Sequence, residues 1–117
     1  MNNNYATNKL LMEVGVSPDL SDYHYLKSAI ESVKEMILGD KINDGFMNLY
    51  AKIAEKFNTT SSRVERAIRH AIANATELNN ASFKTMFNSL VNGNDNPTNS
   101  CFVYTLAEHL IMKEGDK

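Results

Sequence analysis

The sequence predicts an all-α domain of six helices that contains a helix-turn-helix. Three observations support this: apolar residues recur at helical spacing nearly throughout, no segment alternates apolar and polar residues as a strand does, and only two prolines and five glycines interrupt the chain. A chain of 117 residues can bury roughly two thirds of its unfolded surface, which is enough for one core. We therefore expect one domain over residues 1–117, with frayed termini at about 1–4 and 114–117.

The first three helices follow from apolar spacing and from residues suited to helix ends. Residues 5–14 predict a short helix, and Gly15 stands where a C-terminal cap belongs. Ser21 or Asp22 can cap a second helix, and a third is expected over about 46–57. The inward residues expected of these helices are, in order, Leu10, Leu11 and Val14; Leu26, Ile30, Val33 and Ile37; and Leu49, Tyr50, Ile53, Ala54 and Phe57.

Three more helices are predicted in the second half of the chain. Residues 58–60 interrupt the apolar pattern before the fourth helix, and a polar loop at 92–97 separates the fifth helix from the sixth. The inward residues expected here are Val64, Ala67, Ile68, Ala71, Ile72 and Ala75; Phe83, Met86, Phe87, Leu90 and Val91; and Phe102, Val103, Leu106, Ala107, Leu110 and Ile111.

The third and fourth helices have the features of a helix-turn-helix. This motif joins two short helices through a turn of three or four residues, and Ala54 is small enough to let them approach closely. Asn58 tolerates the positive φ that the turn requires, better than any other residue except glycine. Thr60 or Ser61 can cap the second helix of the pair. Spacing, turn residues and helical phase therefore agree on this motif.

Charge is concentrated on the same segment. The net charge is −2, yet the three arginines of the chain, Arg63, Arg66 and Arg69, fall within seven residues. Between Lys52 and His70, five cations oppose two glutamates, so this segment carries +3 and the remainder −5. A molecule polarised in this way has one basic face, which is typical of a nucleic-acid partner despite the acidic total.

Helical phase places the arginines on the outer face of the fourth helix. At about 100° per residue, Ser62, Arg63, Arg66, Arg69 and His70 lie opposite the apolar stripe, with Glu65 at its edge. In a helix-turn-helix this is the face that meets base edges in the major groove, where arginine can grip guanine and glutamate can accept from cytosine N4. The alternative interpretation is an ordinary solvated helix face.

Other function classes lack support in the sequence. The single cysteine, Cys101, excludes an intramolecular disulfide and a site of several cysteines. The three histidines lie far apart, and no glycine-rich phosphate loop, GxSxG or HExxH motif is present. The start of the chain lacks the regions of a signal peptide, and no apolar run approaches the roughly 20 residues of a membrane helix. We expect no catalytic residue, cofactor or metal, no membrane partner, and a cytoplasmic location.

Two stretches, 54–60 and 62–72, closely resemble a known family. It is the C-terminal DNA-binding domain of the sporulation response regulator, stage 0 sporulation protein A, and the resemblance extends over roughly residues 11–110, including Pro97-Thr98-Asn99-Ser100. It implies a six-helix effector domain that binds double-stranded DNA as head-to-tail copies on tandem sites. The implied base-reading residues are Arg63, Glu65 and Arg66, and the implied phosphate or edge contacts are Lys56, Thr59, Ser61, Ser62, Arg69 and His70.

Departures from the family pattern leave two functions open. The loop at 92–96 is less basic than in relatives, and the bulky aromatic residue that relatives have near Thr76 is absent. Both changes suggest weaker DNA affinity, or a partner such as an RNA polymerase sigma subunit or a full-length relative. We expect a transcription regulator without a receiver domain. The alternative is a receiver-less interaction module that pairs with, or antagonises, a full-length regulator.

Overall fold

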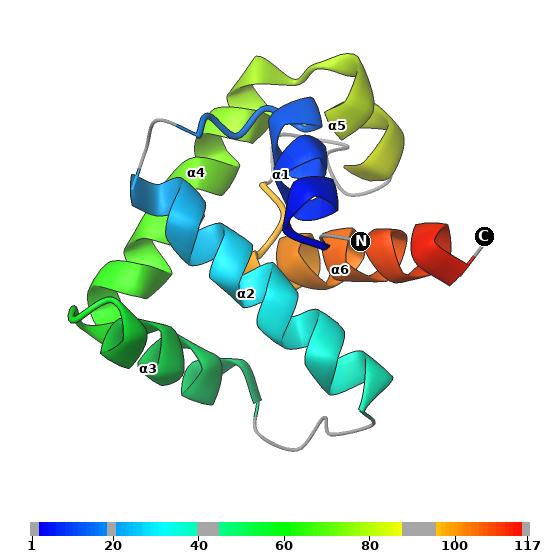
Figure 1. Cartoon of the computed structure of the whole chain (residues 1–117). Helices are drawn as coiled ribbons and strands as arrows, with labels where there is room; N and C mark the ends of the chain where they lie inside the picture. The colour runs from blue at the N-terminus through cyan, green and yellow to red at the C-terminus, as the bar shows by residue number, and fades with distance from the viewer. Residues whose placement is uncertain (1–2, 19–20, 40–44, 88–95, 116–117) are drawn as a thin grey trace.

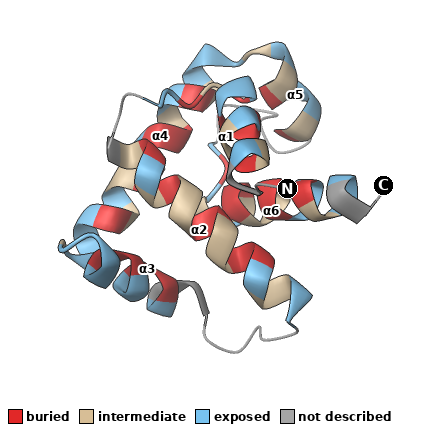
Figure 2. Cartoon of the chain, viewed as in Figure 1, coloured by how far each residue is buried: buried red, intermediate tan, exposed pale blue. Residues whose placement is uncertain are grey.

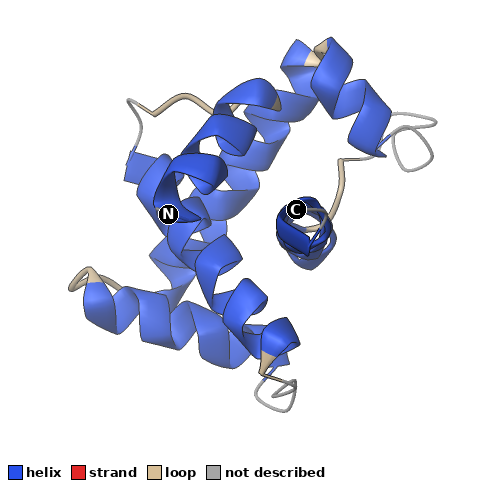
Figure 3. Cartoon of the chain, turned by 45° about the vertical axis from the view of Figure 1, so that its right-hand side comes forward, coloured by secondary structure: helices blue, strands red, loops and turns tan. Residues whose placement is uncertain are grey.

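The computed structural model describes residues 3–18, 21–39, 45–87 and 96–115 of the chain. It confirms the all-α prediction, since these residues form six helices and no strand (Figures 1 and 3). None of these helices combines the length and the apolar character needed to cross a bilayer. The helices are α1 (Asn3–Glu13), α2 (Ser21–Leu38), α3 (Gly45–Lys56), α4 (Ser61–Leu78), α5 (Ala81–Phe87) and α6 (Asn99–Gly115).

Helix α2 crosses the middle of the molecule and packs against α4 and α6 (Figure 1). Helix α3 packs against α2 and α4, while α1 lies against α2 and α6. All six helices contribute buried side chains to one core, and Figure 2 shows these positions along the helix faces that look inward. Burial of this apolar surface is the main favourable contribution to folding.

The short helix α5 is attached to the core by aromatic rings. Phe83 and Phe87 of α5 are fully buried, and their ring centroids lie 5.0 Å apart. The Phe87 ring stacks on Phe102 of α6 at 5.1 Å. A helix of seven residues is not stable alone, so packing against α6 explains why this segment is ordered as a helix.

Helix α1 ends as the sequence predicts, at Gly15. This glycine has φ +101°, the amide of Val16 donates to the Leu11 carbonyl at 2.9 Å, and the amide of Gly15 donates to Met12 at 3.2 Å. These two bonds define a Schellman motif, whose left-handed residue is usually glycine. A Cβ at position 15 would also lie only 3.0 Å from Cδ2 of Leu78, so both conformation and space favour glycine.

One charged network is buried between α1 and α2. The Lys34 side chain is almost entirely buried, with its Nζ 4.0 Å from Oε1 of Glu31. The hydroxyl of the buried Thr7 donates to the other oxygen of the same carboxylate. A buried charge is tolerated when it is paired and hydrogen-bonded, so this network fixes α1 against α2.

The structure corrects one predicted core residue. Phe57 was expected to face inward, but it is 36% exposed, because it stands at the end of α3 where the chain turns away. Its ring instead packs edge-on against Tyr25 of α2, at 5.2 Å between centroids. Leu90, Val91 and most of the polar loop, 92–95, lie outside the described residues.

Candidate nucleic-acid interface

Helices α3 and α4 are joined by a turn that the local sequence explains. Asn58 has φ +56°, as the prediction of a left-handed residue requires. The amide of Thr59 donates to the Ala54 carbonyl at 2.9 Å, and the amide of Asn58 donates to Glu55 at 3.3 Å. The turn is therefore a second Schellman motif, with asparagine in the place that glycine usually takes. It ends α3 abruptly and directs the chain into α4.

Helix α4 begins at a threonine cap immediately after this turn. Of the two candidate caps, Thr60 and Ser61, Thr60 fills the position: its backbone is extended, and its hydroxyl accepts from the amide of Arg63 at 3.2 Å. The buried side chains of Ala54 and Val64 lie on the two helices, which pack against each other. The cap and the small residue together position the first turn of α4.

Asn58→Ala should lower the free energy of unfolding by about 1–2 kcal/mol, because the short polar side chain of asparagine can hydrogen-bond locally and offset the steric cost of the left-handed region, which alanine cannot do. Asn58→Gly is the matched control and should change stability by less than about 0.5 kcal/mol, since glycine adopts this conformation without steric cost. Urea denaturation of both variants measures the difference. Equal stability of the alanine and glycine variants would contradict a strained φ at this position.

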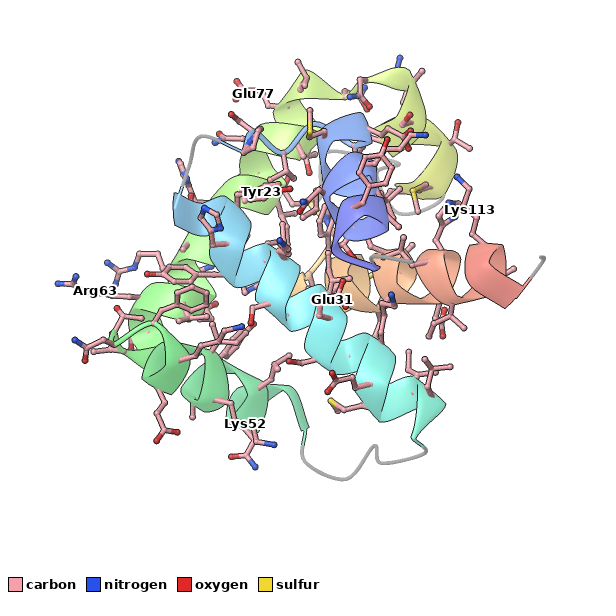
Figure 4. All side chains as sticks on the ribbon, in the orientation of Figure 1. Tyr23, Glu31, Lys52, Arg63, Glu77 and Lys113 are labelled. Carbon is pink, nitrogen blue, oxygen red and sulfur yellow. The ribbon has the colours of Figure 1, made fainter. Side chains whose placement is uncertain are left out.

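The N-terminal half of α4 presents two arginines to solvent. Arg63 and Arg66 are exposed, and within the described ranges neither guanidinium forms an ion pair or hydrogen bond with another side chain. Figure 4 shows the Arg63 side chain pointing away from the body of the molecule beside the α3–α4 turn. Because the two residues are three apart, they lie one above the other on the same helix face. Both cations are therefore accessible to an anionic partner.

Glu65 and Arg69 lie on one flank of this arginine pair and interact with each other. Their side chains form an ion pair one helical turn apart, with 60% of the Arg69 side chain and 37% of the Glu65 side chain exposed. Asn99 at the start of α6 donates from Nδ2 to the Glu65 carbonyl oxygen, 3.1 Å away. The same nitrogen lies 2.9 Å from the hydroxyl oxygen of Tyr50 in α3. This flank thus brings three helices together.

His70 lies on the other flank and contacts α2. Its Nδ1 is 2.8 Å from Oδ2 of Asp22, in the first turn of α2. The Asp22 carboxylate is mostly buried, whereas the imidazole is mostly exposed. This contact fixes the start of α2 beside α4.

The remaining predicted contact residues surround the turn. Lys56, Ser61 and Ser62 are exposed, and Thr59 is half-buried. The Lys56 ammonium lies 5.5 Å from the centroid of the Phe57 ring, so the exposed aromatic of the turn supports a cation beside it. The structure places the nine predicted site residues at the end of α3, on the α3–α4 turn and on α4: Lys56, Thr59, Ser61, Ser62, Arg63, Glu65, Arg66, Arg69 and His70.

Asn99 and Asp22 are site residues whose roles the sequence analysis did not assign. Asn99 lies within the stretch Pro97–Ser100 that carries part of the resemblance, but nothing in that stretch indicates a contact with Glu65, 34 positions away. Asp22 was expected to act as a helix cap, and its carboxylate instead meets His70, 48 positions away. Hydrogen bonds over such separations have no periodic signal in a single sequence.

Tyr50 is the buried titratable group of this flank. Burial raises the pKa of its hydroxyl above the usual 10.0, the Asn99 hydrogen bond opposes this shift, and the Glu65 carboxylate adds to it.

In the part of the chain that the structure describes, no three histidine, cysteine or acidic side chains gather as a metal site would require. The groups that this surface exposes are arginine, lysine, hydroxyl and carboxylate side chains.

The stability of the protein should decline at high pH, in part because of Tyr50. Its folded-state pKa is raised, so the native state holds this proton at pH values where the unfolded chain has lost it. The contribution is fully present below about pH 10 and is lost as pH rises through the folded pKa. Tyr50→Phe should make the decline less steep, as measured by urea denaturation between pH 8 and about pH 11. An unchanged slope would show that Tyr50 titrates alike in both states.

Comparison of the chain with models of protein families matches residues 7–110 to the family described as sporulation initiation factor Spo0A C terminal. The match begins within α1 and ends within α6, so it includes the whole of the helix-turn-helix. It agrees with the resemblance carried by residues 54–60 and 62–72.

Proposed function

The chain belongs to the sporulation initiation factor Spo0A C-terminal family, a family of DNA-binding effector domains, and on that premise we propose that it recognises a specific sequence of double-stranded DNA as a transcription regulator. Helix α4 would lie in the major groove as the recognition helix, and α3 would cross the phosphate backbone. The family is not a family of enzymes, so the proposal assigns binding rather than catalysis to this surface.

The observation that carries the proposal is the accessible pair of arginines at the start of α4. Arg63 and Arg66 are exposed, and no described side chain engages either guanidinium. A helix face that only required solvation would be served by mixed lysine and glutamate, whereas two arginines one turn apart suit bidentate contacts to guanine. The segment around them carries +3 in a chain whose net charge is −2.

We assign base readout to three residues of α4. Arg63 and Arg66 would each donate to O6 and N7 of a guanine, and the partly exposed Glu65 would accept a hydrogen bond from cytosine N4. A carboxylate that faces DNA is repelled by phosphates unless it meets a base-edge donor. Its place inside the arginine cluster therefore favours readout over simple charge attraction.

Phosphate or edge contacts would come from the residues around the turn. Lys56, Ser61 and Ser62 are exposed beside the start of α4, and Thr59 is partly accessible there. Arg69 and His70 each have an acidic neighbour, Glu65 and Asp22 respectively. A phosphate contact by Arg69 or His70 would have to replace or share that neighbour, so we rank both below the other residues.

A second copy of the protein is the proposed partner on DNA. The seven lysines outside the segment 52–70 are scattered along a remainder whose net charge is −5, so one protomer would neutralise only a handful of phosphates and bind weakly at physiological salt. Head-to-tail copies on tandem sites would bind more tightly per site because neighbouring copies add contacts. A sigma subunit of RNA polymerase or a full-length relative would be a further protein partner.

The experiment that tests the function is selection of bound duplexes from a random double-stranded library, followed by competition between the selected and a scrambled duplex. We expect a defined sequence and a selected-to-scrambled affinity ratio well above one, which rises when the site is repeated in tandem. Recovery of random duplexes would contradict sequence-specific binding. Binding that occurred only with a full-length regulator added would favour an interaction module instead.

Lys56→Gln should weaken binding to the selected and scrambled duplexes about equally, because a phosphate contact carries no sequence information. The slope of log affinity against log salt should fall in magnitude by about 0.9, the amount expected for one phosphate. The matched control is Lys84→Gln, which removes an exposed cation from α5 and should change neither quantity. If Lys56→Gln altered only the selected duplex, Lys56 would read bases instead.

A further inference from the structure

Glu65 is held at both its backbone and its side chain. Its carbonyl oxygen accepts from Asn99 Nδ2 at 3.1 Å, and its carboxylate pairs with Arg69. With 37% of its side chain exposed, Glu65 remains open to a ligand while its orientation is restricted. A partly exposed glutamate without such partners would move among several rotamers and lose that freedom on binding DNA.

Asn99 is itself firmly placed. It is the first residue of α6, and the preceding Thr98 caps this helix by accepting from the amide of Cys101 at 3.1 Å. The carboxamide nitrogen of Asn99 also lies 2.9 Å from the hydroxyl oxygen of Tyr50, a buried residue of α3. One side chain from α6 therefore connects both helices of the helix-turn-helix.

We propose that Asn99 and Arg69 are positioning residues for base readout by Glu65: Asn99 fixes the backbone of α4 at Glu65, and Arg69 fixes the carboxylate. This inference rests on the proposed function. Hydrogen bonds to a base edge require placement within about 0.5 Å, which a supporting shell of interactions provides. Because the Arg69 guanidinium is engaged by the Glu65 carboxylate, Arg69 supports specificity rather than acting as a phosphate contact.

The inference predicts a loss of discrimination with little loss of non-specific affinity. Asn99→Ala should lower the selected-to-scrambled ratio by about 5- to 20-fold, because it removes a neutral group that supports one base contact. Affinity for the scrambled duplex should change by less than about twofold, since that binding depends on charge. The control is Thr85→Ala, which removes an exposed polar group from α5 and should retain the ratio.

Arg69 distinguishes positioning from phosphate contact. Arg69→Gln should lower the ratio in the same way and leave the salt slope unchanged. A phosphate contact would instead lower affinity for both duplexes equally and reduce the magnitude of the slope by about 0.9. That second outcome, or an unchanged ratio in Asn99→Ala, would overturn the inference.

Glu65→Gln separates this inference from the proposed function. If Glu65→Gln leaves the ratio unchanged, the proposed readout by Glu65 fails. If Glu65→Gln lowers the ratio while Asn99→Ala and Arg69→Gln do not, only the positioning inference fails. If the proposed readout and the positioning inference are both correct, adding Asn99→Ala to Glu65→Gln should lower the ratio no further, because the two residues act through one contact. All variants are compared at a temperature where circular dichroism shows them folded, with Asn99→Ser replacing alanine if alanine prevents folding.

Discussion

Ile53→Ala is expected to lower the free energy of unfolding by about 2–4 kcal/mol, through lost burial and a cavity between α3 and its neighbours. Ile53 is 2% exposed and lies on α3, which packs against both α2 and α4. Val64→Ala, on the facing helix, should cost less because it removes fewer buried atoms, about 1–3 kcal/mol. Urea denaturation monitored by circular dichroism measures both losses.

The matched control for this prediction is Glu55→Ala, an exposed position on the same helix. It should change stability by no more than about 0.5 kcal/mol, as is usual for surface substitutions. If Ile53→Ala and Val64→Ala unfolded at the same urea concentration as Glu55→Ala, the two residues would not share a core. In that case the packing of α4 against α3 would not depend on these two side chains.

Arg66→Ala is expected to weaken binding to the selected duplex by about 1–3 kcal/mol, the contribution of one bidentate contact between arginine and guanine. Its guanidinium is exposed and is engaged by no described side chain, so no intramolecular bond has to be broken before it reaches a base. Discrimination at one base pair should disappear. Competition with duplexes substituted singly at each position identifies that pair. A uniform loss over all sequences would assign Arg66 to the phosphates.

Glu65→Ala should affect binding to the scrambled duplex and binding to the selected duplex differently. Removal of a carboxylate that phosphates repel should leave affinity for scrambled DNA equal or higher, while preference for the selected sequence falls. The comparison at two salt concentrations separates the two effects, because the repulsion is screened by salt. If Glu65→Ala left the preference for the selected sequence unchanged, base readout by α4 would be rejected in favour of binding to a protein partner.

The order of helices and the turn between α3 and α4 could be predicted from the sequence, because both depend on nearby residues. Apolar spacing determines which face of a helix can be buried, and this holds for Ile30, Val64 and Phe102 alike. Gly15 and Asn58 were identified as left-handed residues because few residue types tolerate that conformation. The outward phase of Arg63 and Arg66 follows from the same local geometry.

Other features were decided only by the packing of distant helices. Phe57 fits the apolar stripe of α3, yet the chain turns at that residue and leaves the ring against Tyr25. His70 and Arg69 both lie on the outward face that the sequence predicts, but His70 meets Asp22 of α2 and Arg69 meets Glu65. The Glu65–Arg69 pair is a contact between residues four apart within α4, whereas the Asp22–His70 contact depends on where α2 lies, which helical periodicity does not specify.

By itself, the sequence determined the all-α class, the helix-turn-helix and a basic outer face on its second helix, since each follows from interactions within a few residues. Only the tertiary structure decided which side chains of that face are held and which are accessible. Asn99 is 34 positions from Glu65 and 49 from Tyr50, and it reaches both because α6 packs within the fold beside α4. A hydrogen bond of this kind depends on placing two backbones to within a fraction of an ångström, and that placement results from the packing of the whole core.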